Sequence, residues 1–107
     1  MNTFHDIKHT LVLISYGGRE LALAGKNAAI MLLLLQHPGG LTRYEMLQKA
    51  HPSLGLWAER GVCRLRCYDV PIETLNEKET TQCGETLAVV RYRVSGPVQL
   101  LKASKLV

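Results

Sequence analysis

The sequence predicts an α+β fold in which three helices lie between an N-terminal β-hairpin and a C-terminal β-hairpin. Two β-rich runs, 10–16 and 19–24, surround Gly17-Gly18 near the start. Helix-forming patterns then occupy the chain up to about residue 67, and β-rich runs return at 70–75 and 87–94. The 107 residues are 47% hydrophobic, which suits one compact domain over residues 1–107.

The N-terminal hairpin is expected over residues 9–24, and a central helix should follow it from residue 26 or 27 to 37. Asn27 is the predicted N-cap of that helix. Pro38 and Gly39-Gly40 end it. Because the segment is apolar nearly all round, we expect it to be covered on several sides.

The second predicted helix spans residues 42–50 and begins with a capping box. In the Thr42-x-x-Glu45 pattern, each side chain satisfies the backbone N–H of the other residue. Leu41 and Met46 stand where a hydrophobic staple requires apolar side chains. His51-Pro52 ends the helix.

The third predicted helix runs from Ser53, its expected N-cap, to about Cys67. Apolar residues recur at helical spacing on one face, and they are Leu54, Ala58, Val62 and Leu65. The opposite face carries Trp57, Arg60, Gly61 and Arg64.

Two strands are expected after these helices, at residues 70–75 and 87–94, followed by an apolar tail over 96–107. The polar stretch 76–86 between the strands is expected to be a loop. The strands and this loop together form a predicted wing over residues 70–94.

The second and third helices, with a turn at 51–55, make a candidate helix-turn-helix over residues 41–67. In that motif the second helix enters the DNA major groove, which is about 12 Å wide and admits one helix. Arg60 and Arg64 would supply donors to base edges, and Arg66 would meet a phosphate or water. Trp57 would pack on a sugar or a thymine methyl. The alternatives are a solvated charged face and a half-buried aromatic residue.

The net charge of +4 and the pI of about 9.2 permit binding to a polyanion without requiring it. Arg43 adds to the positive charge of the helix-turn-helix segment, and Lys78 and Gln82 of the wing could reach the DNA backbone. Three acidic residues oppose contact by the wing, and they are Glu77, Glu79 and Glu85. Arg91 and Arg93 on the next strand would compensate, and Arg91 is a predicted DNA contact.

Several segments resemble the winged helix-turn-helix domains that are common in bacteriophage and prophage genes. The similar pieces are 26–30 (KNAAI), 40–47 (GLTRYEML), 61–66 (GVCRLR), 70–74 (VPIET) and 89–94 (VVRYRV). The preceding hairpin is similar to that of response-regulator effector domains. The resemblance covers Leu21 to Val94, about seven tenths of the chain. It implies DNA binding, with the segment that holds Arg60 and Arg64 as recognition helix.

The three cysteines, Cys63, Cys67 and Cys83, are expected to be reduced thiols, buried or incidental. A metal site of the usual kind needs about four ligands, so no metal and no cofactor is predicted. No carboxylate pair, Ser/His/Asp set or phosphate-binding glycine loop appears in the sequence. The sequence therefore predicts a binding protein and not an enzyme.

The predicted partner is double-stranded DNA, bound by a sequence-specific transcriptional regulator that acts as a homodimer. The alternative is a winged-helix module that binds a host protein through the acidic wing and Trp57. The apolar run from Ala28 to Leu35 is too short to span a bilayer, and residues 1–10 do not resemble a signal peptide. These features predict a cytoplasmic protein with no membrane partner.

Overall fold

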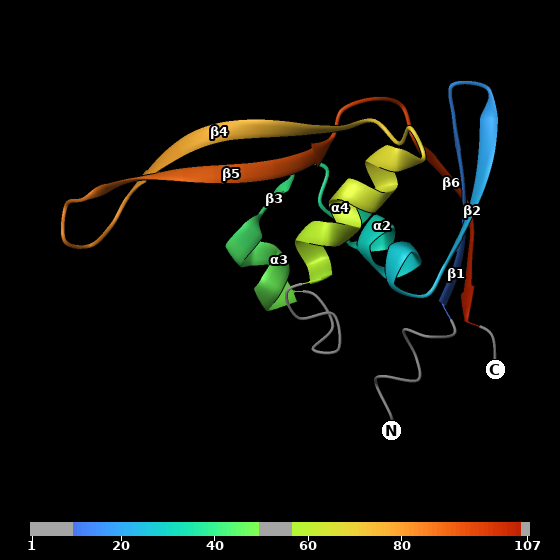
Figure 1. Ribbon diagram of the computed structural model, residues 1–107, viewed down its shortest axis with the longest axis horizontal. Coiled ribbons are helices and arrows are strands. Elements are labelled where there is room, and N and C mark those ends of the chain that lie inside the picture. The colour runs from blue at the N-terminus through green and yellow to red at the C-terminus, as the bar shows by residue number, and fades with distance from the viewer. Residues whose placement is uncertain (1–9, 50–56, 106–107) are drawn as a thin grey trace.

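The computed structural model describes residues 10–49 and 57–105 (Figure 1). Within these ranges it has three helices and six strands. The helices are α2 (Lys26–Gln36), α3 (Arg43–Lys49) and α4 (Trp57–Cys67). The strands are β1 (Thr10–Tyr16), β2 (Arg19–Ala24), β3 (Leu41–Thr42), β4 (Ile72–Thr80), β5 (Thr86–Val94) and β6 (Gln99–Lys105). They form two antiparallel sheets, β2-β1-β6 and β3-β5-β4, so the predicted α+β class is confirmed.

The N-terminal hairpin forms as predicted, with Tyr16 opposite Arg19 across the turn. Gly17 and Gly18 both have positive φ, 58° and 76°, which side chains with a Cβ rarely adopt. Val12 and Ile14 point inward from β1, and Leu23 does so from β2. The hairpin therefore contributes one wall of the core.

The third strand of this sheet was not predicted. The sequence suggested an apolar tail over 96–107, whereas β6 pairs with β1 along most of its length, with a bulge at Leu13/Ile14. Figure 1 shows β6 (red) beside β1 (blue), although the two lie at opposite ends of the chain. This pairing satisfies the backbone N–H and C=O groups on the outer edge of β1. The pairing cannot be deduced from a sequence pattern, because it joins backbone groups of distant segments.

Helix α2 is the central helix, as predicted, with Ile30, Met31 and Leu34 fully buried. The helix begins at Lys26, one of the two predicted starts, but the predicted N-cap at Asn27 is wrong. Gly25 occupies the N-cap with φ 64°, and no side chain caps the helix. The chain thus turns into the helix before Asn27, whose buried Oδ1 has no hydrogen-bond partner among the described residues.

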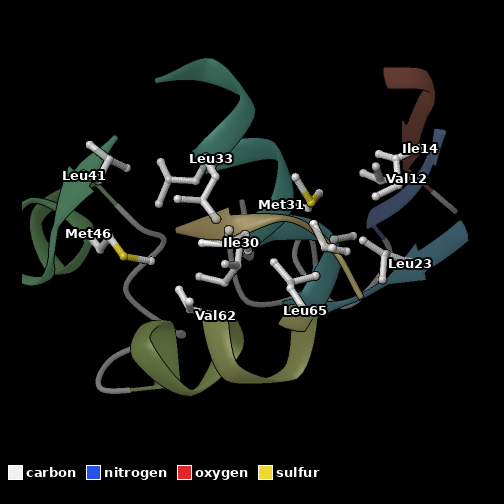
Figure 2. Packing of buried hydrophobic residues seen from close by; sticks show 14 of the residues in the cluster. Val12, Ile14, Leu23, Ile30, Met31, Leu33, Leu41, Met46, Val62 and Leu65 are labelled. Atoms are coloured by element: carbon white, nitrogen blue, oxygen red, sulfur yellow. The ribbon is translucent and has the colours of Figure 1, made fainter. Parts of the chain in front are cut away.

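Helix α3 begins with the predicted capping box. Glu45 N–H donates to Thr42 Oγ1 over 3.1 Å, and Thr42 N–H donates to Glu45 Oε1 over 2.9 Å. Leu41 and Met46, the predicted staple residues, are both buried in the core (Figure 2). Leu41 and Thr42 also pair with β5 as the short strand β3, which was not predicted. The predicted end at Ala50, the turn at 51–55 and the Ser53 cap lie outside the described residues.

Helix α4 ends as predicted, at Cys67, and a Schellman motif closes it. Val70 N–H donates to Leu65 O over 3.1 Å, and Asp69 N–H donates to Arg66 O over 2.9 Å. Asp69 takes the left-handed conformation at φ 64°. Val62 and Leu65 project from α4 into the core, Val62 near Ile30 and Leu65 near Leu23 (Figure 2).

The β4–β5 hairpin is longer than predicted. The loop expected over 76–86 is mostly strand, because β4 continues to Thr80 and β5 begins at Thr86. Only residues 81–85 form the turn, where Thr81 N–H donates to Glu85 O over 2.8 Å. The hairpin extends past α3 and away from the body of the molecule (Figure 1). Backbone pairing between two strands stabilises this polar stretch, which lacks the apolar alternation that marks strands in sequence.

Candidate nucleic-acid interface

The outer face of α4 is the surface on which the predicted contacts were placed. Val62 and Leu65 are buried on the inner face as predicted, whereas Gly61, which was predicted on the opposite face, is buried too. At about 100° per residue, the outer face carries the exposed residues Arg60, Cys63, Arg64 and Cys67. These four residues line one open depression of about 320 Å³. The helix is therefore anchored on one side and solvated on the other.

Arg60 and Arg64 are exposed on this face, one helical turn apart. Neither guanidinium has an ion-pair or hydrogen-bond partner within the described part of the chain. Their donors remain available to an incoming acceptor. A pair of exposed arginines at this spacing suits phosphate or base-edge oxygens, to which an Arg fork binds in bidentate fashion.

Arg66 lies on the flank of α4 that faces the β4–β5 hairpin. Its Nε donates to Ile72 O over 3.1 Å, and its second guanidinium nitrogen donates to Thr74 Oγ1. The guanidinium carbon also lies 5.7 Å from the centre of the Tyr92 ring. Arg66 thus joins the end of α4 to the base of the hairpin and fixes the angle between them.

Arg43, the first residue of α3, forms an ion pair with Glu59 in the first turn of α4. The distance from Arg43 Nε to Glu59 Oε2 is 3.2 Å, and both side chains are substantially exposed. This ion pair links α3 to α4 at the protein surface. Trp57 opens α4, but its side chain lies outside the described part of the structure.

Arg91 occupies the centre of a network that joins β5 to the start of α3. Its Nε donates to Glu77 Oε1 over 2.8 Å, and one terminal nitrogen donates to Glu45 Oε1 and to Gly40 O, each over 3.1 Å. The hydrogen bond to Glu77 raises the pKa of Arg91, with the charges of Glu77 and Glu45 acting in the same direction. The Arg91 side chain, which was predicted to contact DNA, is thus hydrogen-bonded within the protein in this structure.

Arg93 forms an ion pair with Glu73 on the adjacent strand. Together with Arg91 it neutralises two acidic side chains of β4, Glu73 and Glu77. Lys78 and Gln82 are exposed in the outer part of the hairpin, Lys78 opposite Ala88 in the ladder and Gln82 in the turn. Both residues belong to the part of the β4–β5 hairpin that extends away from the helices (Figure 1).

A second hollow, of about 520 Å³, lies between α3, α4 and β5. Its lining residues are Thr42, Arg43, Tyr44, Leu47, Glu59, Ala88, Val89, Val90 and Tyr92. Tyr44 is 68% exposed, Leu47 40% and Val90 37%, so the walls present apolar surface to solvent. Burial raises the pKa of Tyr92, and the neighbouring Glu59 carboxylate raises it further. The sequence reasoning missed this hollow, although Ala88, Val90 and Tyr92 do share one face of the predicted strand.

The cysteines were predicted to be reduced thiols, buried or incidental, and the structure excludes burial, because Cys63, Cys67 and Cys83 are all exposed free thiols. Over residues 10–49 and 57–105, no three His, Cys, Asp or Glu side chains are grouped so as to hold a metal ion. In the same ranges, none of the helices combines the length and apolar character needed to cross a bilayer.

Comparison of the chain with protein-family models, with curated proteins and with solved structures finds no match.

Proposed function

We propose that this chain is a winged helix-turn-helix protein that binds double-stranded DNA, with α4 as the recognition helix and the β4–β5 hairpin as the wing. The observation that carries the proposal is the outward face of α4, where Arg60 and Arg64 are exposed and have no partner within the described residues. A helix with its side chains is about 10–12 Å across, which matches a major groove about 12 Å wide.

The proposed roles of the other basic residues follow from their contacts. Arg66, held by Ile72, Thr74 and the Tyr92 ring, positions the wing relative to α4. Lys78 and Gln82 extend the contact to the DNA backbone beyond the major groove. The ion pairs of Arg91 and Arg93 remove the charge of two wing carboxylates that would otherwise repel phosphate. In this proposal the protein acts as a sequence-specific transcriptional regulator.

Selection of bound sequences from random duplex DNA tests the proposal, followed by measurement of affinity against salt concentration. The log–log slope is expected to be near −4 for about four to five phosphate contacts. Arg64→Gln or Arg60→Gln should weaken binding by about 1–3 kcal/mol if the residue contacts a base. Lys102→Gln removes one exposed charge from β6, on the other sheet, and should leave binding unchanged. Equal binding by the parent and both arginine variants would disprove the assignment of α4.

A second candidate function is binding of a host protein, and the hollow between α3 and β5 favours it. Its exposed apolar walls, Tyr44, Leu47 and Val90, are of the kind that protein interfaces bury. A pull-down from nuclease-treated lysate separates the two functions. A partner lost with Leu47→Ser but kept with Arg60→Gln would favour the protein-binding function. Recovery of DNA that is lost with Arg60→Gln but kept with Leu47→Ser would favour DNA binding through α4.

Homodimerisation remains part of the proposal, because a single small module covers little DNA. The outer edges of the β2-β1-β6 sheet are β2 and β6, and Leu100 and Leu101 on β6 are each 43% exposed. Sedimentation of the free protein measures whether two copies associate.

A further inference from the structure

Cys63 and Cys67 have no part in the proposed DNA contact, yet they lie beside Arg60 and Arg64 on the surface that would make it. Both thiols are free and exposed. They share a single depression with Arg60 and Arg64, and these four side chains account for its lining. The two cysteines are four positions apart on α4, so they lie on the same face of the helix, one above the other.

The spacing of the two thiols is wrong for a disulfide bond. Side chains at i and i+4 have Cβ atoms about 5–6 Å apart. A disulfide needs Cβ atoms about 3.5–4.5 Å apart, so forming one would distort the helix. The same spacing suits an ion between two sulfurs. Zinc–thiolate bonds are about 2.3 Å long, and bonds of about that length place two sulfurs on opposite sides of an ion about 4.6 Å apart.

The ligand set restricts which ion fits. Structural zinc takes four ligands, and no third His, Cys, Asp or Glu joins the two thiols within the described residues. Soft thiolates select Cu(I), which two sulfurs suffice to hold. Binding releases one proton from each thiol to solvent and changes no oxidation state. The resulting bis-thiolate complex carries one negative charge, and the guanidinium groups of Arg60 and Arg64 line the same depression.

We propose that Cys63 and Cys67 form a two-coordinate site for one Cu(I) ion on the outer face of α4. The consequence for DNA rests on the proposed function. A bound copper bis-thiolate adds a negative charge beside the two arginines and draws their guanidinium groups toward it. Because phosphate and base acceptors compete for those same donors, the copper-loaded protein binds duplex DNA more weakly than the metal-free protein.

The site itself is tested without DNA. The reduced full-length chain is titrated with Cu(I) under anaerobic conditions, in competition with a coloured copper chelator. One ion per chain is expected, and Cys63→Ser and Cys67→Ser should each abolish competition with the chelator. Cys83→Ser is the matched control, because Cys83 lies in the turn of the wing, and it should bind like the parent. Binding that survives both helix substitutions, or one ion shared between two chains, overturns the proposal.

The regulatory step is measured separately, on the duplex that selection from random DNA yields. Adding Cu(I) should weaken the affinity of the parent chain at least tenfold, and a copper chelator should restore it. The Cys63→Ser/Cys67→Ser variant should bind the duplex as the metal-free parent does and ignore copper. If copper binds and the affinity for DNA does not change, the regulatory step is rejected and the copper site still stands. Failure of the metal-free protein to bind any duplex rejects the proposed function, and the titration still decides the copper site.

Discussion

The guanidinium group of Arg91 donates a hydrogen bond to the Glu45 carboxylate over 3.1 Å, although 46 positions separate the two residues. Glu45 Oε1 is the same atom that accepts the backbone N–H of Thr42 in the capping box. Two contacts thus hold the start of α3. One is the local cap, and the other is the side chain of Arg91 on β5, a strand much later in the chain. This junction holds the first helix of the proposed helix-turn-helix against the wing.

Replacement of Arg91 by Ala should destabilise the protein by about 1–2 kcal/mol. The Arg91 side chain is only 22% exposed, and its removal takes a donor from Glu77 and from Gly40 O and leaves Glu45 Oε1 with the Thr42 N–H alone. Urea unfolding measures the loss, and a double-mutant cycle with Glu45→Ala isolates the coupling between the two residues. The more exposed Arg93, paired with Glu73, provides the comparison and should cost less. A coupling near zero would show that the pair adds nothing beyond the cap.

Loss of the Thr42 hydroxyl should cost about 1 kcal/mol, the usual value for an N-cap. Thr42 Oγ1 accepts the Glu45 N–H at the start of α3, a group that has no other intrahelical partner. Thr42→Ser keeps the hydroxyl and loses only the methyl group, so the difference in unfolding free energy between Thr42→Ala and Thr42→Ser measures the cap alone. Equal stability of the two variants would contradict this role.

Stability should fall in acid partly through Glu45. The hydrogen bond from the Thr42 backbone N–H lowers the pKa of Glu45 below its ordinary value of 4.5, and the Arg91 charge acts in the same direction against desolvation. A depressed pKa in the folded state adds stability above the unfolded pKa and loses it as the pH drops through the folded pKa. Because the side chain is 36% exposed, we expect less than about 1 kcal/mol. Glu45→Gln should flatten the dependence of unfolding free energy on pH below about 4.5.

Gly40 and Gly39 should respond in opposite ways to alanine. Gly40 has φ 91°, and a Cβ there would lie 2.8 Å from the carbonyl oxygen of Tyr92 and 3.0 Å from Arg93 Cβ. A Cβ at Gly39 would meet no atom within 4 Å, and Gly39 has no positive φ. Gly40→Ala should therefore cost about 2 kcal/mol or more, and Gly39→Ala should be neutral or stabilising by up to about 1 kcal/mol. Thermal unfolding of the pair checks this, and similar melting temperatures would contradict the close approach.

Arg66 and Arg64 should differ in their effect on the salt dependence of DNA binding. Removal of a phosphate contact lowers the magnitude of the log–log slope by about 1, which is the expectation for Arg64→Gln if it binds phosphate. Arg66 is engaged with Ile72, Thr74 and Tyr92, so Arg66→Gln should reduce affinity through a displaced wing and leave the slope unchanged. If Arg66→Gln instead lowers the magnitude of the log–log slope, Arg66 contacts a DNA phosphate directly.

Features that depend on neighbours within a few positions could be predicted from the amino-acid sequence. The Gly17-Gly18 turn, the Thr42–Glu45 cap and the two-sided pattern of α4 each follow from local backbone geometry. For that reason the positions of Arg60 and Arg64 on the outer face of α4 could be predicted.

Contacts between distant parts of the chain, in contrast, could be identified only from the folded structure. Sequence spacing gives the direction of Arg66 and Arg91 but not their partners, which lie on strands elsewhere in the chain. The pairing of β6 with β1 and the extension of β4 and β5 depend on backbone hydrogen bonds between distant segments. Such bonds require no particular side chains, so a linear pattern carries little record of them.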